Sequence, residues 1–178
     1  MRNQCAAIML CFETDRLCFK RMDECDREEF TKLLRSLDVT QYCFDTPSLR
    51  EIKIQFESRL QPWDVESTHW LSLSIYEKSS GSFVGVIGLK KTNMSGDVGF
   101  LLKPEYHGLG YGTESLKAVR EFSKSLGITE LSARITKGNI ASVGVVKKCG
   151  FVLVAEHKNT IFINQKKYND LKFRCILL

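Results

Sequence analysis

A strand, a glycine-rich loop and a helix follow one another between residues 97 and 113, and this order constrains the fold more than any other stretch of the chain. The segment reads DVGFLLKPEYHGLGYGT, with glycine at positions 108, 110 and 112. Glycine lets a backbone approach an anion closely, and the first turn of a helix offers unpaired N–H groups and the positive end of the helix dipole. The segment therefore predicts a pyrophosphate-binding loop. The alternative is a tight turn with a purely structural role.

The glycine spacing does not match the two common nucleotide-binding motifs. A dinucleotide fingerprint that starts at Gly108 would need a third glycine at position 113, where the chain has threonine. A P-loop needs two glycines five positions apart followed by Lys and Ser or Thr, and no two glycines of this chain have that separation. Nucleoside triphosphate binding therefore loses its main support.

Length and charge favour one globular domain that binds anions. The chain has 178 residues and a mass of 20.3 kDa, enough to bury a core, and we expect residues 1–178 to form a single domain. Residues 1–12 are expected to be a tail or an extension of the first strand rather than a secretory signal. No stretch approaches the roughly 20 apolar residues of a membrane span, so no membrane association is expected. The net charge of +5 mildly favours anionic ligands, but the basic residues are dispersed, which argues against nucleic-acid binding.

The cysteines and histidines indicate an intracellular protein without a metal site. Seven cysteines are an odd number and lack CxxC spacing, so we expect reduced, buried thiols and a cytoplasmic location. The histidines, at positions 69, 107 and 157, form no cluster with cysteines or carboxylates.

Hydrophobic periodicity predicts alternating strands and helices. Asp26 with Glu29 suggests a capping box for a helix through Leu37, and Ser48 opens a second helix through about residue 60 by pairing with Glu51. Strands are expected at 16–21, on both sides of a turn at 78–81, at 98–102, at 130–136, and at 151–157 and 168–178 around a turn at 164–165. Further helices are expected beyond the glycine loop, with apolar residues from Leu116 to Leu126 and a stop at Gly127, and at 141–148. The result is a mixed α/β domain whose middle strands are antiparallel before a helix crosses over.

A second motif follows the strand at 130–136. Its residues are Asn139, Ser142, Lys148, Gly150 and Phe151. Asn139 is suited to cap the short helix that it precedes, and Gly150 is suited to end it. Taken alone, these residues are as compatible with packing and solvation as with a binding site.

In combination, the two motifs resemble those of the GNAT family of acyl-CoA-dependent N-acetyltransferases. The loop at 107–112 fits the family's (Gln/Arg)-x-x-Gly-x-(Gly/Ala) pattern at its glycines. PEY at 104–106 with GYGTE at 110–114 is similar to the branch that contains the ribosomal-protein N-terminal acetyltransferases (RimJ/RimL-like). Residues 139–151 match the second motif of that branch, N-x-x-S followed by K-x-G-F.

The resemblance spans nearly the whole chain from residue 13. Residues 14–17 with Arg21 are similar to the opening strand of the branch, and residues 168–170 to its closing strand. The chain departs from the pattern at His107, where the family has Gln or Arg, and at Leu109, where a basic or polar residue is common. Backbone amides do most of the phosphate binding, so these departures bear on affinity more than on identity.

The resemblance implies a mostly antiparallel central sheet with helices on both faces and a splayed cofactor cleft. The strand at 98–102 would bulge and pair with the pantetheine arm of acetyl-CoA, the cosubstrate, and the loop amides would bind its pyrophosphate. Asn139 would reach the pantetheine, and Lys147 or Lys148 the 3′-phosphate, unless the lysines form only a solvated helix end. No metal is implied. The implied cofactor-binding residues are Phe100, Leu101, Leu102, His107, Gly108, Leu109, Gly110, Tyr111, Gly112, Thr113, Asn139 and Lys148.

The implied chemistry is direct attack of a neutral amine on the thioester carbonyl, which needs a general base and a general acid. We expect Asp97 to be the base, with Glu105 and Glu77 as alternatives. We expect Ser142 to be the acid, with Tyr168 as the alternative proton donor. Asp97 and Ser142 also have structural interpretations, as a turn carboxylate and a first-turn helix serine.

The predicted function is transfer of an acetyl group from acetyl-CoA to a primary amine without an acyl-enzyme, so Cys149 is expected to be a small core residue. Candidate acceptors are a protein N-terminal α-amino group, an antibiotic, a polyamine or an amino acid. A catalytically weak or inactive acyl-CoA-binding module is the alternative. We expect a monomer or a homodimer. The aromatic residues that would shape the acceptor site, or serve as core, are Tyr42, Phe44, Trp63, His69 and Trp70.

Overall fold

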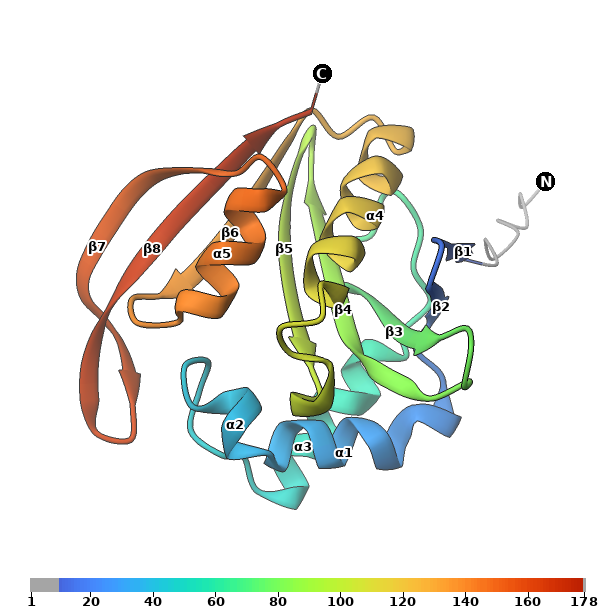
Figure 1. The fold of residues 1–178 in the computed structure, drawn as a ribbon, viewed down its shortest axis with the longest axis horizontal. Helices are drawn as coiled ribbons and strands as arrows, with labels where there is room; N and C mark the ends of the chain where they lie inside the picture. The colour runs from blue at the N-terminus through green and yellow to red at the C-terminus, as the bar shows by residue number, and fades with distance from the viewer. Residues whose placement is uncertain (1–9, 178) are drawn as a thin grey trace.

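The computed structural model describes residues 10–177, which build an eight-stranded sheet flanked by helices (Figure 1). The strands are β1 (Cys11–Glu13), β2 (Leu17–Arg21), β3 (Leu71–Glu77), β4 (Phe83–Thr92), β5 (Ser95–Leu102), β6 (Glu130–Thr136), β7 (Val152–Ile163) and β8 (Lys166–Ile176). The α-helices are α1 (Arg27–Arg35), α2 (Leu37–Thr40), α3 (Leu49–Arg59), α4 (Tyr111–Ser125) and α5 (Ile140–Lys148). Short 3₁₀ turns precede α1 (Glu24–Asp26) and the glycine loop (Pro104–Tyr106).

The strands lie in the order β1-β2-β3-β4-β5-β6-β8-β7, and every neighbouring pair is antiparallel except β5 and β6. α4 connects these two parallel strands, because parallel neighbours need a long crossover rather than a tight turn. The expected mixed, mostly antiparallel sheet with one helical crossover is confirmed.

Helices cover both faces of the sheet. Successive residues of a strand point to opposite sides, so one strand can pack against helices on both faces. In β4, Ile87 belongs to the core cluster that contains Leu116 of α4, whereas the adjacent Val86 belongs to the cluster that contains Phe30 of α1 and Phe56 of α3. We call these two sides the α4 face and the α3 face. α4 and α5 lie in front of the sheet in Figure 1, and α1–α3 gather at its lower end.

The pairing between β5 and β6 ends halfway along both strands. Their parallel register runs from Ser95 opposite Glu130 to Val98 opposite Ala133 and stops there. Beyond that point β5 stays paired with β4, and β6 with β8, to their ends. The sheet therefore opens into a V, and the splayed cleft is confirmed. The expected bulge is wrong, because β5 keeps an unbroken register with β4.

The start of α1 differs from the expected capping box. Asp26 is its N-cap residue but makes no side-chain cap bond; the box is formed one turn earlier, between Asp23 and Asp26 around the 3₁₀ turn. The Asp26 carboxylate is buried and accepts hydrogen bonds from the hydroxyls of Ser74 (2.7 Å) and Tyr76. It therefore joins the helix to β3 instead of capping α1.

Most of the other helix and strand boundaries lie close to those predicted from the sequence. Ser48 and Glu51 form the expected capping box at α3. Gly127, at a φ of +74°, follows the end of α4. Leu37 is 62% exposed and starts α2 instead of completing α1. β7 is longer than expected, β8 begins and ends two residues earlier than expected, and the two strands form an extended hairpin around residues 164–165.

The cysteines are less uniform than expected. Cys149 and Cys175 are buried, Cys18 and Cys43 are half-buried, and Cys11 and Cys25 are exposed; all six are free thiols, and Cys5 lies outside the described residues. The expectation of buried thiols is therefore wrong for the exposed pair. Over residues 10–177 no three His, Cys, Asp or Glu side chains gather as metal ligands, and no helix there has the length and apolarity to cross a bilayer.

Candidate active site

The glycine loop has a backbone geometry that glycine adopts readily. Gly108 and Gly110 have φ values of +76° and +85°, in the left-handed region that a Cβ atom disfavours. Gly110 is the N-cap of α4, and the helix ladder begins with the Glu114 amide, which donates to the Gly110 carbonyl (3.0 Å). The amides of residues 111–113 thus face out of the helix start without an intrahelical partner.

An ion pair holds the loop against the turn between β1 and β2. Arg16 Nη2 lies 2.7 Å from Glu114 Oε2, and Arg16 Nη1 donates to the Leu109 carbonyl (3.1 Å). The Thr14 hydroxyl donates to Glu114 Oε1 (2.6 Å). Burial alone would raise the pKa of Glu114, but hydrogen bonds from Thr14 and Arg16 outweigh it and lower that pKa. The loop is therefore held in place before any ligand binds.

Two residues of the loop segment, Leu109 and Tyr111, line none of the cavities described below. The Tyr111 hydroxyl donates to the Glu77 carboxylate, and the Arg16 guanidinium lies 4.2 Å from the centre of the Tyr111 ring. This hydrogen bond raises the pKa of Tyr111 and lowers that of Glu77. The side chain of Leu109 is exposed. Because Glu77 and Arg16 hold the Tyr111 side chain, a ligand contact of Tyr111 would run through its backbone.

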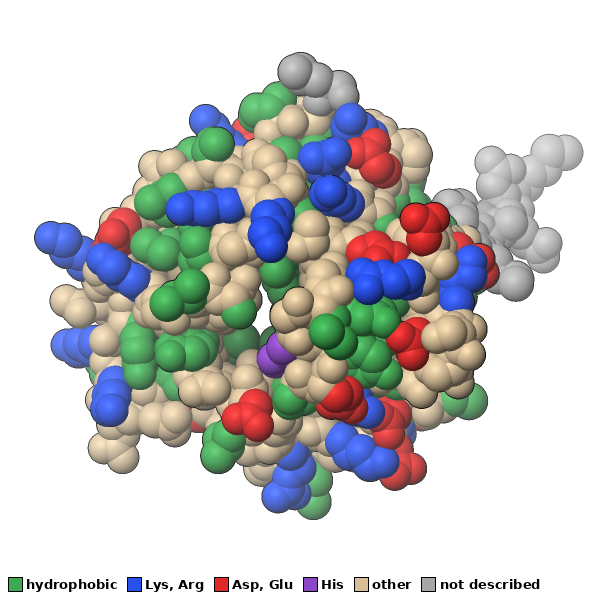
Figure 2. All heavy atoms as spheres, in the orientation of Figure 1, with side chains coloured by type: hydrophobic (Ala, Val, Ile, Leu, Met, Phe, Trp, Pro, Cys, Tyr) green, Lys and Arg blue, Asp and Glu red, His purple; other side chains and the backbone are tan. Residues whose placement is uncertain are grey.

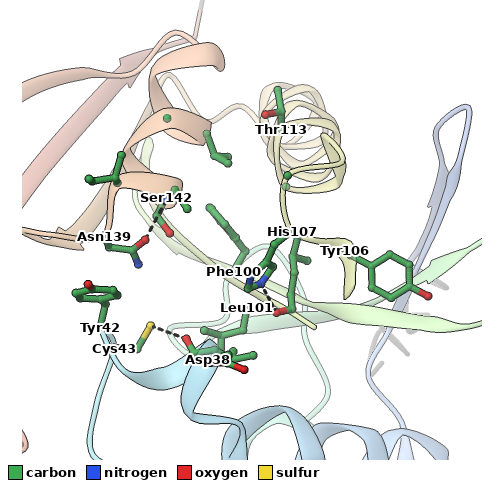
Figure 3. Close-up of a pocket in the computed structure, with 18 of the residues that line it drawn as sticks. Asp38, Tyr42, Cys43, Phe100, Leu101, Tyr106, His107, Thr113, Asn139 and Ser142 are labelled. Atoms are coloured by element: carbon green, nitrogen blue, oxygen red, sulfur yellow. Dashed lines mark hydrogen bonds between the residues drawn. The ribbon is translucent and has the colours of Figure 1, made fainter. Parts of the chain in front are cut away.

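A cavity of about 630 Å³, here called the loop cavity, lies between the glycine loop, α5 and residues 38–43 (Figure 3). Figure 2 shows a hollow on this side of the molecule, with Lys and Arg side chains above it. His107 closes one side, with its Nε2 2.8 Å from the Leu102 carbonyl. Among the expected cofactor-binding residues, those that line the cavity are Phe100, Leu101, Leu102, His107, Gly108, Gly110, Gly112, Thr113, Asn139 and Lys148.

A shallower hollow of about 460 Å³ continues outward from the glycine loop. Lys117 of α4 and Lys148 of α5 line it, and Lys148 also lines the loop cavity. Asp15 and Glu114 also line the hollow, and Glu114 is paired with Arg16. The two lysines place positive charge beside the helix start, where the unpaired amides already favour an anion. Lys147 lines neither space, so Lys148 is the better placed of the two expected lysines.

A second cavity of about 440 Å³, the cleft cavity, occupies the V between β5 and β6 and the α3 face beside it. Of the aromatic residues expected to shape an acceptor site, Tyr42, Phe44 and Trp70 line this cavity. Trp63 is instead buried in the core, and His69 Nε2 lies 3.1 Å from the Pro62 carbonyl.

The two cavities share a wall at the V. Ser142 and Asn139 sit there on the first turn of α5, and Figure 3 shows them facing Tyr42 across the opening. Asn139 Oδ1 accepts a hydrogen bond from the Ser142 amide (3.1 Å), so Asn139 caps α5 as expected. The other shared lining residues are Cys43, Phe100 and Leu101.

The other catalytic candidates lie elsewhere. Asp97 is exposed and sits opposite Ser132, in the part of β5 that is still paired with β6, so it does not face the cleft. The cleft opens only beyond Val98. The sequence indicates that Asp97 belongs to this strand, but it does not indicate where the strand separates from its neighbour. Tyr168 pairs with Ile161 on the β7–β8 hairpin and lines neither cavity.

The side chains of the two alternative bases have other partners. Glu77 is occupied by Tyr111, and Glu105 is an exposed partner of Lys103 (3.3 Å). Neither carboxylate lines the loop cavity or the cleft cavity.

Sequence reasoning missed the charged residues of the cleft cavity. Asp170 of β8, Arg134 of β6 and Arg59 of α3 line it. Asp170 was part of the closing-strand similarity but had no assigned role, and a lone carboxylate in an alternating strand carries no signal of burial. Its pairing opposite Thr136, at the open end of β6, is what turns it toward the cleft.

Comparison with known proteins decides the family. Residues 16–152 match the acetyltransferase (GNAT) domain family. The chain belongs to the GNAT acetyltransferases. A curated relative, the uncharacterized N-acetyltransferase YobR of Bacillus subtilis, is 26% identical over 83 residues, which are 47% of this chain and 33% of that protein. The chain thus spans about a third of the length of this relative.

Solved GNAT structures share the fold at low identity. Spermidine N-acetyltransferase from Vibrio cholerae, in complex with CoA and spermine, superposes with a TM-score of 0.79 at 15% identity, covering 92% of this chain and 97% of that one. A putative ribosomal-protein-serine acetyltransferase from Vibrio cholerae has a TM-score of 0.76 at 20% identity, covering 94% and 97%. The predicted resemblance and the GNAT fold are therefore confirmed.

Within residues 10–177, this member of the GNAT family has no cysteine prepared as a nucleophile near the V. Burial raises the pKa of Cys43, which lines both cavities, and that of Cys149, which is fully buried behind the loop. Cys149 Sγ donates to the Thr113 carbonyl (3.4 Å). A raised pKa keeps a thiol protonated and weakly nucleophilic, and the expected core position of Cys149 is confirmed.

Proposed function

We propose that the chain transfers an acetyl group from acetyl-CoA to a primary amine by direct attack, without an acyl-enzyme. One observation carries the proposal: two cavities, one behind the glycine loop and one on the α3 face, meet at the V where β5 and β6 separate. A coenzyme in the first and an amine in the second would face each other at that junction.

The loop cavity fits the coenzyme. The unpaired amides at the start of α4 suit a pyrophosphate, and Lys148 and Lys117 suit a further phosphate. The unpaired edge of β5 beyond Val98 offers N–H and C=O groups to an amide-bearing arm, as a neighbouring strand would. Asn139 lies where the arm would reach the V.

Acetyl-CoA would supply an activated acyl carbon as a thioester. The acceptor starts as an ammonium ion, forms a C–N bond as the C–S bond breaks, and loses two protons in all; one ends on the sulfur and the other in solvent. We retain Ser142 as the proton donor to sulfur, because it is the candidate acid that lines both cavities. Asp97 and Tyr168 line neither, so they have no part in this proposal.

Membership of the GNAT family does not by itself identify the acceptor amine. Structural neighbours include enzymes named for spermidine and for ribosomal proteins, so the fold accommodates both kinds of amine. We favour a protein N-terminal α-amino group, because the cleft cavity is open and lined by aromatic residues that suit an extended chain.

The test is acetyl-CoA binding followed by turnover. We expect calorimetry to show one-site binding of CoA and acetyl-CoA, and thiol release to depend on an added amine. Binding without thiol release across peptides, polyamines, amino acids and aminoglycosides would instead identify an acyl-CoA-binding module. Absence of coenzyme binding would refute both functions.

A further inference from the structure

Asp170 is an incompletely satisfied carboxylate at the edge of the proposed junction. Its side chain is almost fully buried, with the residue 3% exposed, and its Oδ1 has no hydrogen-bond partner. Its Oδ2 lies 3.4 Å from Arg134 Nη1. A buried carboxylate oxygen without a donor costs free energy, which a ligand that supplies an N–H group removes. Because Asp170 lines the cleft cavity, the acceptor amine is the donor best placed to do so.

Arg59 is a second unmatched group in the same cavity. Its Nη1 donates to the Ser72 hydroxyl (3.1 Å), and its guanidinium lies 5.5 Å from the centre of the Phe30 ring. Its Nε is buried without a partner, and within residues 10–177 no carboxylate forms an ion pair with it. Burial also lowers the pKa of Arg59, as expected for a cation removed from water without a counter-ion. An anionic ligand would supply that counter-ion.

The balance of charge in the cleft cavity disfavours a polyamine. Its charged lining residues in the described chain are Asp170, Arg134 and Arg59. Asp170 and Arg134 offset each other, so Arg59 leaves the cavity positive. A polyamine would bring two or more positive charges to one carboxylate and two guanidinium groups, whereas an amine with an anionic group matches this lining.

The separation of the two groups indicates an extended acceptor. Arg59 is bound to β3 through Ser72, and Asp170 lies on β8, with β4, β5 and β6 between them. At about 4.8 Å per strand step, and more across the V, these anchors are on the order of 20 Å apart. Both side chains reach into the cavity, which leaves on the order of 10 Å, roughly the span of three extended residues. The carboxylate of a free amino acid, only about 3 Å from its amine, cannot reach both.

We propose that the acceptor is a peptide-like monoamine whose terminal amine lies at Asp170 and whose anionic group, about three residues along, pairs with Arg59. This inference rests on the proposed acetyl transfer and names its acceptor class. Asp170 orients the amine toward the V, and Arg59 determines which chains are accepted.

The first test compares acceptors at saturating acetyl-CoA by thiol release. The probes are Ala-Ala-Glu-Ala-amide, Ala-Ala-Gln-Ala-amide, spermidine and free glutamate. We expect kcat/KM for the Glu peptide to exceed that for the Gln peptide by at least tenfold, and the other two to be poorer still. Equal use of the two peptides, or preference for spermidine or glutamate, would overturn the proposal.

The second test removes the Arg59 charge. We expect Arg59→Met to reduce the Glu-over-Gln preference to within threefold, mainly through KM, and Arg59→Lys to retain part of it. Arg50→Met, an exposed charge change on the same helix, should keep the full preference. Thermal melts show whether the variants fold. If Arg59→Met does not fold, Arg59→Lys is tested in its place. A folded variant of either kind that keeps the full Glu-over-Gln preference contradicts the proposal.

A binding measurement separates this inference from the proposed function. If acetyl-CoA binds but no amine releases thiol, the transfer reaction is refuted, yet calorimetry can still compare the two peptides on the CoA complex. Tenfold tighter binding of the Glu peptide to wild type, lost in Arg59→Met, supports the charge preference. Equal binding refutes it. Asp170→Asn should weaken both peptides alike.

Discussion

A pair of glycine-to-alanine changes separates the binding role of the glycine loop from its conformational role. Gly108 in the loop and Gly81 in the β3–β4 turn have φ values of +76° and +70°, and a Cβ at either would meet no atom within 4 Å. The backbone cost of alanine is therefore matched at the two sites. Only Gly108 lines the loop cavity.

The expected effects on stability are equal. An L-residue in the left-handed region costs about 1–2 kcal/mol, and for a chain of this size each kcal/mol lowers Tm by about 2–4 °C. Both variants should therefore melt roughly 2–8 °C below wild type.

The expected effects on coenzyme affinity differ. A methyl group at Gly108 would stand where a phosphate approaches the loop amides, and loss of one hydrogen bond to a charged group costs about 1.5–3 kcal/mol. At 1.4 kcal/mol per factor of ten, Kd for acetyl-CoA should rise about 10–150-fold in Gly108→Ala. It should be unchanged in Gly81→Ala.

The assay is calorimetric titration with acetyl-CoA after melting curves have shown that both variants fold. If Gly108→Ala binds acetyl-CoA as tightly as Gly81→Ala, the loop is only a tight turn, and the phosphate-binding argument fails.

Three further predictions test the acid, the thiol and the loop anchor. Ser142→Ala should lower kcat by about 10²-fold or more, with coenzyme Kd unchanged; turnover within a few-fold of wild type would dismiss Ser142 as the acid. Cys149→Ala should keep kcat within a few-fold while lowering Tm, and a loss of turnover in folded protein would revive a covalent route. Because hydrogen bonds lower the pKa of Glu114 in the folded state, its contribution to stability is present above its unfolded pKa and is lost as pH falls through the lower folded pKa. The difference in urea midpoint between wild type and Glu114→Gln should therefore shrink from pH 6 to pH 3; a constant difference would contradict this.

Most of the fold could be predicted because its signals are local. The capping box at Ser48, the turn at 164–165 and the glycine after α4 each depend on neighbouring residues alone. Asp26 shows where this fails: its carboxylate is bound by Ser74 and Tyr76, some 50 positions away in the sequence, and that tertiary contact overrides the local capping preference.

The candidate site could be predicted on one side of the sheet only. The glycine-loop and α5 residues of the loop cavity belong to two continuous motifs, so their spacing identified them together, whereas residues 38–43 on its other side belong to neither motif. The charged residues of the cleft cavity are single residues of α3, β6 and β8, and no spacing links Arg59, Arg134 and Asp170. Asp97 failed as a cleft residue because alternation gives the face of a strand residue but not the point at which two strands separate.

The splayed sheet explains why sequence motifs predict the loop cavity but not the cleft cavity. Separation of β5 and β6 opens one passage through the sheet, with the glycine loop and α5 on the α4 face and Arg59 and Asp170 on the α3 face. The proposed coenzyme is held by backbone amides, which any sequence with the right glycines can present, whereas the proposed acceptor is read by side-chain charge. A family can therefore keep its loop motif while the α3 face changes, because a substitution at a residue such as Arg59 alters the charge of the acceptor cavity without touching the loop. Among the described residues, the lining of the cleft cavity holds one carboxylate and two guanidinium groups, a composition that suits an acidic peptide better than a polyamine.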